Sequence, residues 1–119
     1  MEKPHKKLEA WKQSVDLVIE IYKTTEVFPS KEIYGITNQV RRAAVSIPSN
    51  IAEGAARQTK KEFTNFLHIA QGSLSELDTQ IEIASRLGYL DVKSRKGLDN
   101  KMTPIDKMIT GLIRHLSKK

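Results

Sequence analysis

The chain has 119 residues, of which 39% are hydrophobic, and this length suits one domain, residues 1–119, with one modest core. It contains no cysteine, which excludes disulfides, thiolate metal sites and cysteine nucleophiles. Twenty lysines and arginines against fourteen acids leave a formal charge of +6, which favours anionic partners. The chain has no apolar run long enough for a membrane span and no apolar segment typical of a signal peptide near its start, so a cytoplasmic protein is expected.

Apolar residues recur three or four positions apart in four segments, which predicts four helices. The pattern of the first segment stops at Phe28 and Pro29. Its predicted buried stripe consists of Leu8, Trp11, Val15, Val18 and Tyr22. Trp11 lies within this stripe, which favours a place in the core over a role as an anchor for a partner.

The second segment runs from about Glu32 to Ala56 and contains the stretch RRAAVSIPSNIAEGAAR. Its predicted stripe consists of Ile33, Ile36, Val40, Ala43, Ile47 and Ile51. Pro48 lies within this stripe, where it removes an amide donor and crowds the carbonyl of Ala44, at a cost of about 3 kcal/mol. A kinked but continuous second helix is therefore predicted, with nearby serine and asparagine side chains or water satisfying the freed carbonyl.

The third segment begins with Thr59, which can form a capping box with Glu62, and ends at Gly88. Its predicted stripe consists of Phe63, Phe66, Ala70, Leu74, Leu77, Ile81 and Ala84. The fourth segment begins after Asp91, and Gly97 and Pro104 make it the least regular of the four. Its predicted stripe consists of Leu98, Met102, Ile105, Ile109, Leu112 and Leu116.

Short connections place consecutive helices antiparallel, so the expected fold is an all-α, up-down-up-down four-helix bundle. In this fold the phenylalanine, leucine and methionine stripes are core packing rather than a cofactor site, and no cofactor is expected. No segment shows the alternation typical of strands.

Further apolar residues lie beside these stripes, among them Met108 and Ile113. A second apolar face would be exposed on a monomer, which indicates self-association. The predicted oligomer interface consists of Leu17, Ile21, Ile69 and Ile83. The alternative is that these residues widen the core stripes of tightly packed helices.

Basic residues gather at one end of the predicted bundle, where the start of the first helix, the second connection and the end of the fourth helix meet. The candidate nucleic-acid-binding residues at this end are Lys6, Lys7, Arg57, Lys60, Lys61, Arg114, Lys118 and Lys119, with Lys3 beside them. Such an end would attract a phosphate backbone without reading sequence. The alternative is an ordinary solvated surface, because lysines near helix C-termini are also favoured by the helix dipole.

Arg41 and Arg42 lie in the middle of the second helix and complete the candidate nucleic-acid-binding set, although structural pairing with an acid is an alternative. The three histidines are far apart and show no spacing typical of a metal site, so no metal site is expected. Ser46 and Ser49 have no histidine nearby to act as a base. No catalytic residue is predicted, and the chain is not expected to be an enzyme.

Three segments resemble one known family: YGITNQVRRAAVSIPSNIAEGAAR (Tyr34 to Arg57), EFTNFLHIAQGSLSEL (Glu62 to Leu77) and ASRLGYL (Ala84 to Leu90). The chain is similar to the proteins of intervening sequences in bacterial 23S rRNA genes, the four helix bundle protein family. The resemblance implies a left-handed bundle, a homopentamer with a central channel and no established enzymatic activity. Related proteins act as accessory factors of diversity-generating retroelements, where a basic barrel contacts reverse transcriptase and nucleic acid. Gly97 and Pro104 depart from the more regular fourth helix of the family.

Two functions follow as hypotheses. The first is an oligomer that binds RNA, DNA or a ribonucleoprotein through the basic end, with reverse transcriptase as one candidate partner. The second is a protein-binding scaffold for an acidic partner, without direct contact to nucleic acid.

Overall fold

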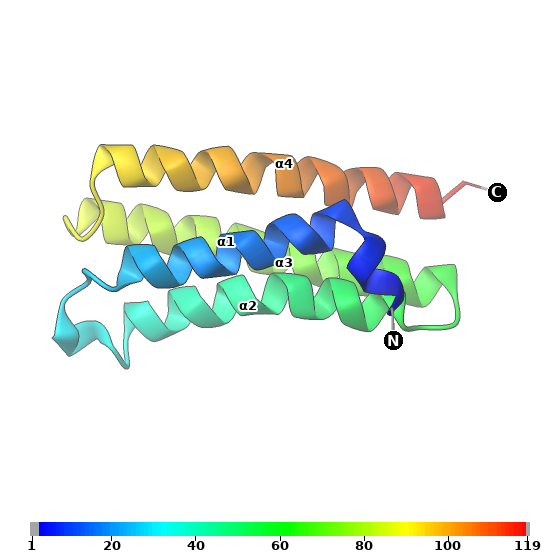
Figure 1. Ribbon diagram of the computed structural model, residues 1–119, viewed down its shortest axis with the longest axis horizontal. Helices are drawn as coiled ribbons and strands as arrows, with labels where there is room; N and C mark the ends of the chain where they lie inside the picture. The colour runs from blue at the N-terminus through cyan, green and yellow to red at the C-terminus, as the bar shows by residue number, and fades with distance from the viewer. Residues whose placement is uncertain (1–2, 119) are drawn as a thin grey trace.

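The computed structural model describes residues 3–118, which form four long helices and two short 3-10 helices (Figure 1). In chain order the elements are η1 (Pro4–Lys7), α1 (Glu9–Thr25), η2 (Ser30–Glu32), α2 (Ile36–Ala55), α3 (Lys60–Arg86) and α4 (Val92–Leu116). No strand occurs within this part of the chain, and the prediction of an all-α four-helix fold is confirmed.

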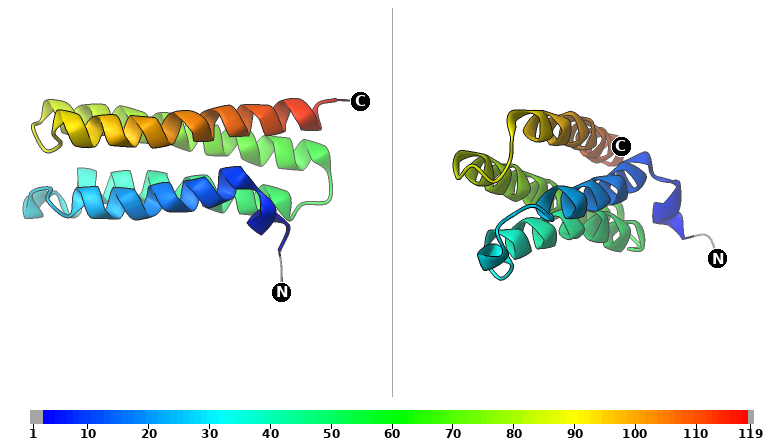
Figure 2. Two further views of the ribbon diagram at one scale, coloured as in Figure 1. Left: turned by 45° about the horizontal axis from the view of Figure 1, so that its top comes forward. Right: turned by 60° about the vertical axis from the view of Figure 1, so that its left-hand side comes forward.

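The chain reverses direction after each long helix, so consecutive helices run side by side in opposite directions (Figure 1). In the left-hand view of Figure 2, α3 and α4 form one layer and α1 and α2 form the other. The most extensive packing joins α2 to α3, and α1 and α4 complete the ring of neighbouring pairs. The largest fully buried side chains include Leu17, Ile21, Ile47, Ile51, Leu67, Leu77, Ile81, Leu98, Ile105 and Ile109.

The buried face of α1 differs from the predicted stripe. It consists of Ala10, Ser14, Leu17, Ile21 and Thr25. Val15 is only half-buried and Tyr22 is exposed, although both were predicted to face the core. Two hydroxyl groups explain the shift, because Ser14 donates to the Ala10 carbonyl (2.5 Å) and Thr25 to the Ile21 carbonyl (2.8 Å). Polar residues satisfied in this way can occupy buried positions.

This shift corrects part of the predicted oligomer interface. Leu17 and Ile21 are both 0% exposed, so the prediction that they contribute to an exposed apolar face is wrong. They lie at the centre of the face that α1 buries in the bundle. For these two residues the alternative interpretation, a wide core stripe, is the right one.

The helix α2 begins at Ile36, later than predicted, because residues 30–32 form η2 and the chain turns at Gly35. Ile33 therefore precedes the helix and is exposed, and its place in the predicted stripe is wrong. The hydroxyl group of Tyr89 donates to a carboxylate oxygen of Glu32 (2.8 Å) and joins η2 to the α3–α4 connection. This hydrogen bond raises the pKa of Tyr89, since it stabilises the neutral phenol.

Pro48 is buried inside α2, which continues past it to Ala55, and Val40, Ala43, Ile47 and Ile51 are buried as predicted. A bend at Pro48 stays a prediction. The neighbouring polar side chains serve other acceptors: the Asn50 amide donates to the Ser46 carbonyl (2.8 Å) and hydroxyl (2.9 Å). The Ser46 hydroxyl in turn pairs with that of Ser73 on α3 (2.8 Å), so these groups join α2 to α3.

Replacing Pro48 by alanine is expected to preserve or raise the melting temperature. Alanine restores an amide donor for the Ala44 carbonyl, and the gain in helix propensity has an upper limit of about 3 kcal/mol. The lost ring of a buried side chain opposes part of this gain. Thermal unfolding followed by circular dichroism measures the difference. Global unfolding of the variant would show that α2 depends on the proline, which contradicts this account.

Local interactions fix the ends of α3 as predicted. The hydroxyl group of Thr59 accepts from the amide of Glu62 (3.1 Å) and also donates to its carboxylate (2.9 Å). In the capping box, the Glu62 carboxylate thus accepts its reciprocal hydrogen bond from the Thr59 hydroxyl group rather than from the Thr59 amide. At the other end, Gly88 has a φ of +82°, and the amide of Tyr89 donates to the Ala84 carbonyl (3.0 Å). Together with the bond from the Gly88 amide to the Ser85 carbonyl, this is a Schellman motif.

The helix α4 is continuous from Val92 to Leu116 and passes through both Gly97 and Pro104. These two residues, which make the fourth segment the least regular in sequence, therefore do not interrupt the helix. The carboxylate of Asp91 accepts from the amide of Ser94 (2.7 Å) and caps the helix, and this hydrogen bond lowers the pKa of Asp91. The predicted core positions Leu98, Met102, Ile105 and Ile109 are all buried.

Candidate nucleic-acid interface

Three separate parts of the chain meet at one end of the bundle. The N-terminal segment with η1, the connection between α2 and α3, and the end of α4 all lie on the right in Figure 1. The antiparallel order of the helices brings them together, as predicted. We call this the basic end, and its described cationic residues are Lys3, Lys6, Lys7, Arg57, Lys60, Lys61, Arg114 and Lys118. The predicted residue Lys119 lies outside the described residues.

The side chains of the basic end are all exposed. Within residues 3–118, only one of them forms an ion pair: Arg57 contacts Glu53 through an N–O distance of 2.6 Å. The Arg57 guanidinium also lies over the ring of Phe66, 4.9 Å from its centroid. The lysines of the basic end therefore keep their ammonium groups available to an anion in solution.

Few carboxylates oppose these cations. Glu53 is occupied by Arg57, and Glu62 is occupied by the cap at Thr59. Glu9 begins α1 and accepts a hydrogen bond from the Gln13 amide (3.3 Å). The basic end therefore carries a clear excess of positive charge. Its attraction for an anionic partner would become stronger as added salt is removed, because the charges are then screened less.

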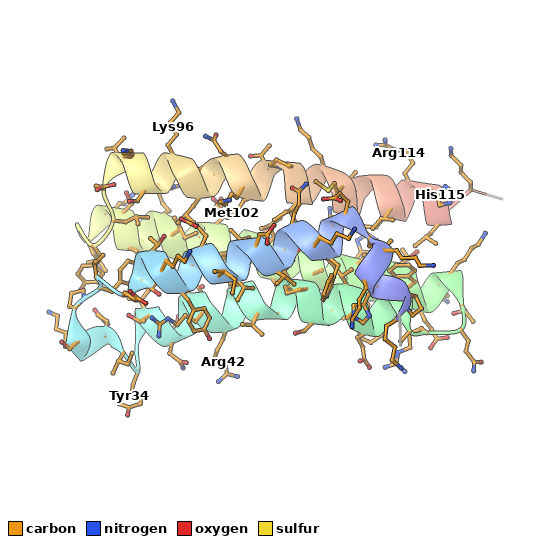
Figure 3. All side chains as sticks on the ribbon, viewed as in Figure 1. Tyr34, Arg42, Lys96, Met102, Arg114 and His115 are labelled. Carbon is orange, nitrogen blue, oxygen red and sulfur yellow. The ribbon has the colours of Figure 1, made fainter. Side chains whose placement is uncertain are left out.

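Arg41 and Arg42 do not join the basic end. Arg41 is half-buried, lies over the ring of Tyr22 at 4.6 Å from its centroid, and donates from Nε to the Thr25 hydroxyl (2.9 Å). It thus connects α2 to the last turns of α1, in line with the structural alternative, although its partners are an aromatic ring and a hydroxyl group rather than an acid. Arg42, on α2, is exposed and points away from the bundle, at a distance from Arg114 on α4 (Figure 3).

A shallow hollow of about 760 Å³ lies between the end of α1 and the start of α2, beside these arginines. Exposed apolar side chains line it, namely Tyr22, Ile33, Tyr34 and Val45. Tyr34 is 93% exposed and points away from the helices (Figure 3). The sequence patterns assigned Tyr22 and Ile33 to the core, so this hollow was not predicted.

The two remaining residues of the predicted oligomer interface lie on α3. Ile69 is 51% exposed and Ile83 is 46% exposed, and Leu87 follows them at the end of the same helix at 54%. Their spacing places Ile69 and Ile83 on one side of α3, and Leu87 is the residue that follows the helix. These residues are accessible to a partner, in contrast to Leu17 and Ile21.

The opposite end of the bundle contains a cluster of ion pairs around Arg95. Its guanidinium group contacts Glu82 (2.7 Å), Asp99 (3.4 Å) and Asp78 (4.0 Å) and is 21% exposed. Hydrogen bonds from Arg86 and Arg95 lower the pKa of Glu82, because both stabilise its ionised form. Arg95 is thus fully engaged, whereas the lysines of the basic end are not.

Residues 3–118 contain no group of three or more histidine, aspartate or glutamate side chains arranged to hold a metal ion. Among the helices of this region, none combines the length and apolar character needed to cross a membrane.

The model of the family described as 23S rRNA-intervening sequence protein matches residues 6–111. No curated protein matches the chain. The fold is similar to the 1.70 Å crystal structure of a protein of unknown function from the S23 ribosomal protein family of Bacteroides thetaiotaomicron VPI-5482. That likeness has a TM-score of 0.81 at 23% identity and covers 88% of this chain and 95% of the other.

Proposed function

Because the chain belongs to the 23S rRNA-intervening sequence protein family, we propose that it is a non-enzymatic protein that binds nucleic acid or a ribonucleoprotein in the cytoplasm. The observation that carries the proposal is the basic end, where exposed lysines from three segments lie together with few opposing carboxylates. The affinity comes from phosphate groups, since lysine ammonium groups that replace condensed counterions bind any sequence.

Replacing Arg57, Lys60 and Lys61 together by glutamine is expected to weaken RNA binding and flatten its dependence on salt. Each lost phosphate contact lowers the slope of log K against log salt by about 0.7 for a single strand. Fluorescence anisotropy of a labelled RNA oligonucleotide measures both quantities. The fold should persist, because exposed charges contribute little to stability.

A matched control removes the same charge elsewhere. Lys23, Lys31 and Lys101 are exposed and lie outside the basic end. Their triple glutamine variant should keep more of the wild-type affinity and slope than the variant of the basic end. Equal losses in the two variants would show that only net charge matters and would refute a localised site.

The scaffold hypothesis draws its support from the hollow beside Arg41. Tyrosine and arginine are enriched at protein interfaces, and Tyr22, Tyr34 and Arg41 all line this hollow. An acidic partner would use this surface with Arg42, at a distance from the basic end. Binding that survives loss of the basic end and disappears with Tyr34→Ala would favour this second function.

We also propose that the protein forms a homo-oligomer, with the pentamer implied by the family resemblance as the expected state. Exposed Ile69 and Ile83 on α3 support association. Light scattering after gel filtration is expected to give a mass several times the 13.5 kDa of one chain. Replacing both isoleucines by glutamate should then yield smaller species. A wild-type mass of 13.5 kDa would refute the oligomer.

A further inference from the structure

The outer face of α4 carries a row of cations that extends from the basic end along the bundle. Its basic residues are Lys93, Lys96, Lys107, Arg114 and Lys118, of which the last follows the end of the helix. All five are exposed, and none forms an ion pair within residues 3–118. Figure 3 shows Lys96 and Arg114 pointing away from the other helices.

Helical spacing places the four of these residues that lie within α4 on one side of the helix. At 3.6 residues per turn they fall within a sector of about 60°, and Asn100 and Gly111 share that sector. Both of these residues are exposed. An asparagine side chain donates hydrogen bonds to phosphate oxygens, so Asn100 would help to fill the gap between Lys96 and Lys107.

The acids of α4 face elsewhere. The helix contains two, Asp99 and Asp106, and each contacts a group on the side towards α3. Asp99 accepts from Arg95, which also binds Glu82 of α3, and Asp106 accepts from the amide of Gln71 on α3 (3.3 Å). The negative charge of α4 is thus directed to the α3 side, and the outer face remains purely cationic.

We propose that this outer face binds the phosphate backbone of a nucleic-acid duplex. Lys93 and Arg114 are about 32 Å apart along the helix axis, which corresponds to roughly nine base pairs of B-form DNA. The row carries no aromatic side chain, and single-strand binding relies on stacking of unpaired bases on aromatic rings. Contacts to phosphate alone suit a duplex, in which the bases are already stacked.

The same composition disfavours other anionic partners. Protein interfaces are depleted in lysine and depend on aromatic or arginine anchors, and this face has one arginine and no aromatic residue. An interfacial helix buries an apolar face in the membrane, whereas the apolar face of α4 is buried in the core.

This inference rests on the proposed nucleic-acid binding. It names a duplex as the form of nucleic acid that is bound and the outer face of α4 as the surface along which the duplex lies. The test compares wild-type protein with the variant Lys93→Gln/Lys96→Gln/Lys107→Gln, which leaves the basic end intact. Binding to a labelled DNA duplex of about 20 base pairs is measured across a range of salt concentrations. The expected result is a fall in slope of about 2.7 and at least a tenfold loss of duplex affinity at moderate salt, with a smaller effect on a single strand. The control is again the Lys23, Lys31 and Lys101 variant, since Lys101 lies on α4 outside this sector.

The outcomes separate the two claims. If the α4 variant binds the duplex as the control does while the variant of the basic end binds weakly, the α4 path is wrong and the proposed function stands. If the α4 variant loses binding to anionic lipid vesicles or to an acidic protein but keeps binding to the duplex, the assignment of a duplex as the partner of this face is wrong. If wild-type protein binds no nucleic acid at low salt, both claims fall. Unchanged circular dichroism and melting temperature of each variant exclude misfolding as the cause.

Discussion

Replacing Ile21 by alanine is expected to lower the free energy of unfolding by about 2–5 kcal/mol, because the variant loses buried methyl groups and leaves a cavity. Ile21 is 0% exposed and lies in the middle of the buried face of α1. Chemical denaturation followed by circular dichroism measures the change. The same result would distinguish a core residue from the interface residue that the sequence pattern suggested.

Ile19 provides a control in the same helix. It is the same residue type and is 52% exposed, so Ile19→Ala should change the free energy of unfolding by no more than about 0.5 kcal/mol. Similar losses at the two positions would show that the buried face of α1 has been assigned to the wrong residues.

Replacing Gly54 by alanine is expected to destabilise the protein by about 1–3 kcal/mol, although alanine is the better helix former. A Cβ atom at this position would lie 2.7 Å from Cβ of Phe66 and 2.9 Å from Cδ1 of Phe63. Both contacts are closer than packed carbon atoms allow, and the first involves an atom next to the α3 backbone. The two helices would therefore have to separate at the point where Gly54 lets them approach.

Gly72 provides the opposite case. It lies inside α3, and an added Cβ would meet no atom within 4 Å. Gly72→Ala should therefore raise the free energy of unfolding by about 0.5–1 kcal/mol through helix propensity alone. The two identical substitutions thus differ in sign. Stabilisation by Gly54→Ala would contradict the close contact between α2 and α3.

The ends of α3 could be predicted because local interactions fix them. Thr59 and Glu62 are three residues apart, and Gly88 supplies a positive φ that no neighbour needs to impose. The register of α1 could not be predicted from apolar spacing. Ser14 and Thr25 are buried only because each hydroxyl group bonds to a backbone carbonyl of its own helix.

The same contrast holds for the candidate site. The meeting of three basic segments followed from the order of the helices, which the short connections determine. The environment of Arg41 could not be predicted from the order of the helices, because it depends on Tyr22 and Thr25 across the α1–α2 contact. The spacing of Lys93, Lys96 and Lys107 was visible in the sequence, but its meaning depends on which side of α4 faces α3.

The central claim, binding to nucleic-acid phosphates, is tested most directly by the salt dependence of RNA binding to the wild-type protein. Fluorescence anisotropy on a labelled oligonucleotide gives the association constant at each salt concentration. We expect a linear fall of log K with log salt, with a slope set by several phosphate contacts at about 0.7–0.9 per contact. No binding at low ionic strength, or binding that does not respond to salt, would contradict it.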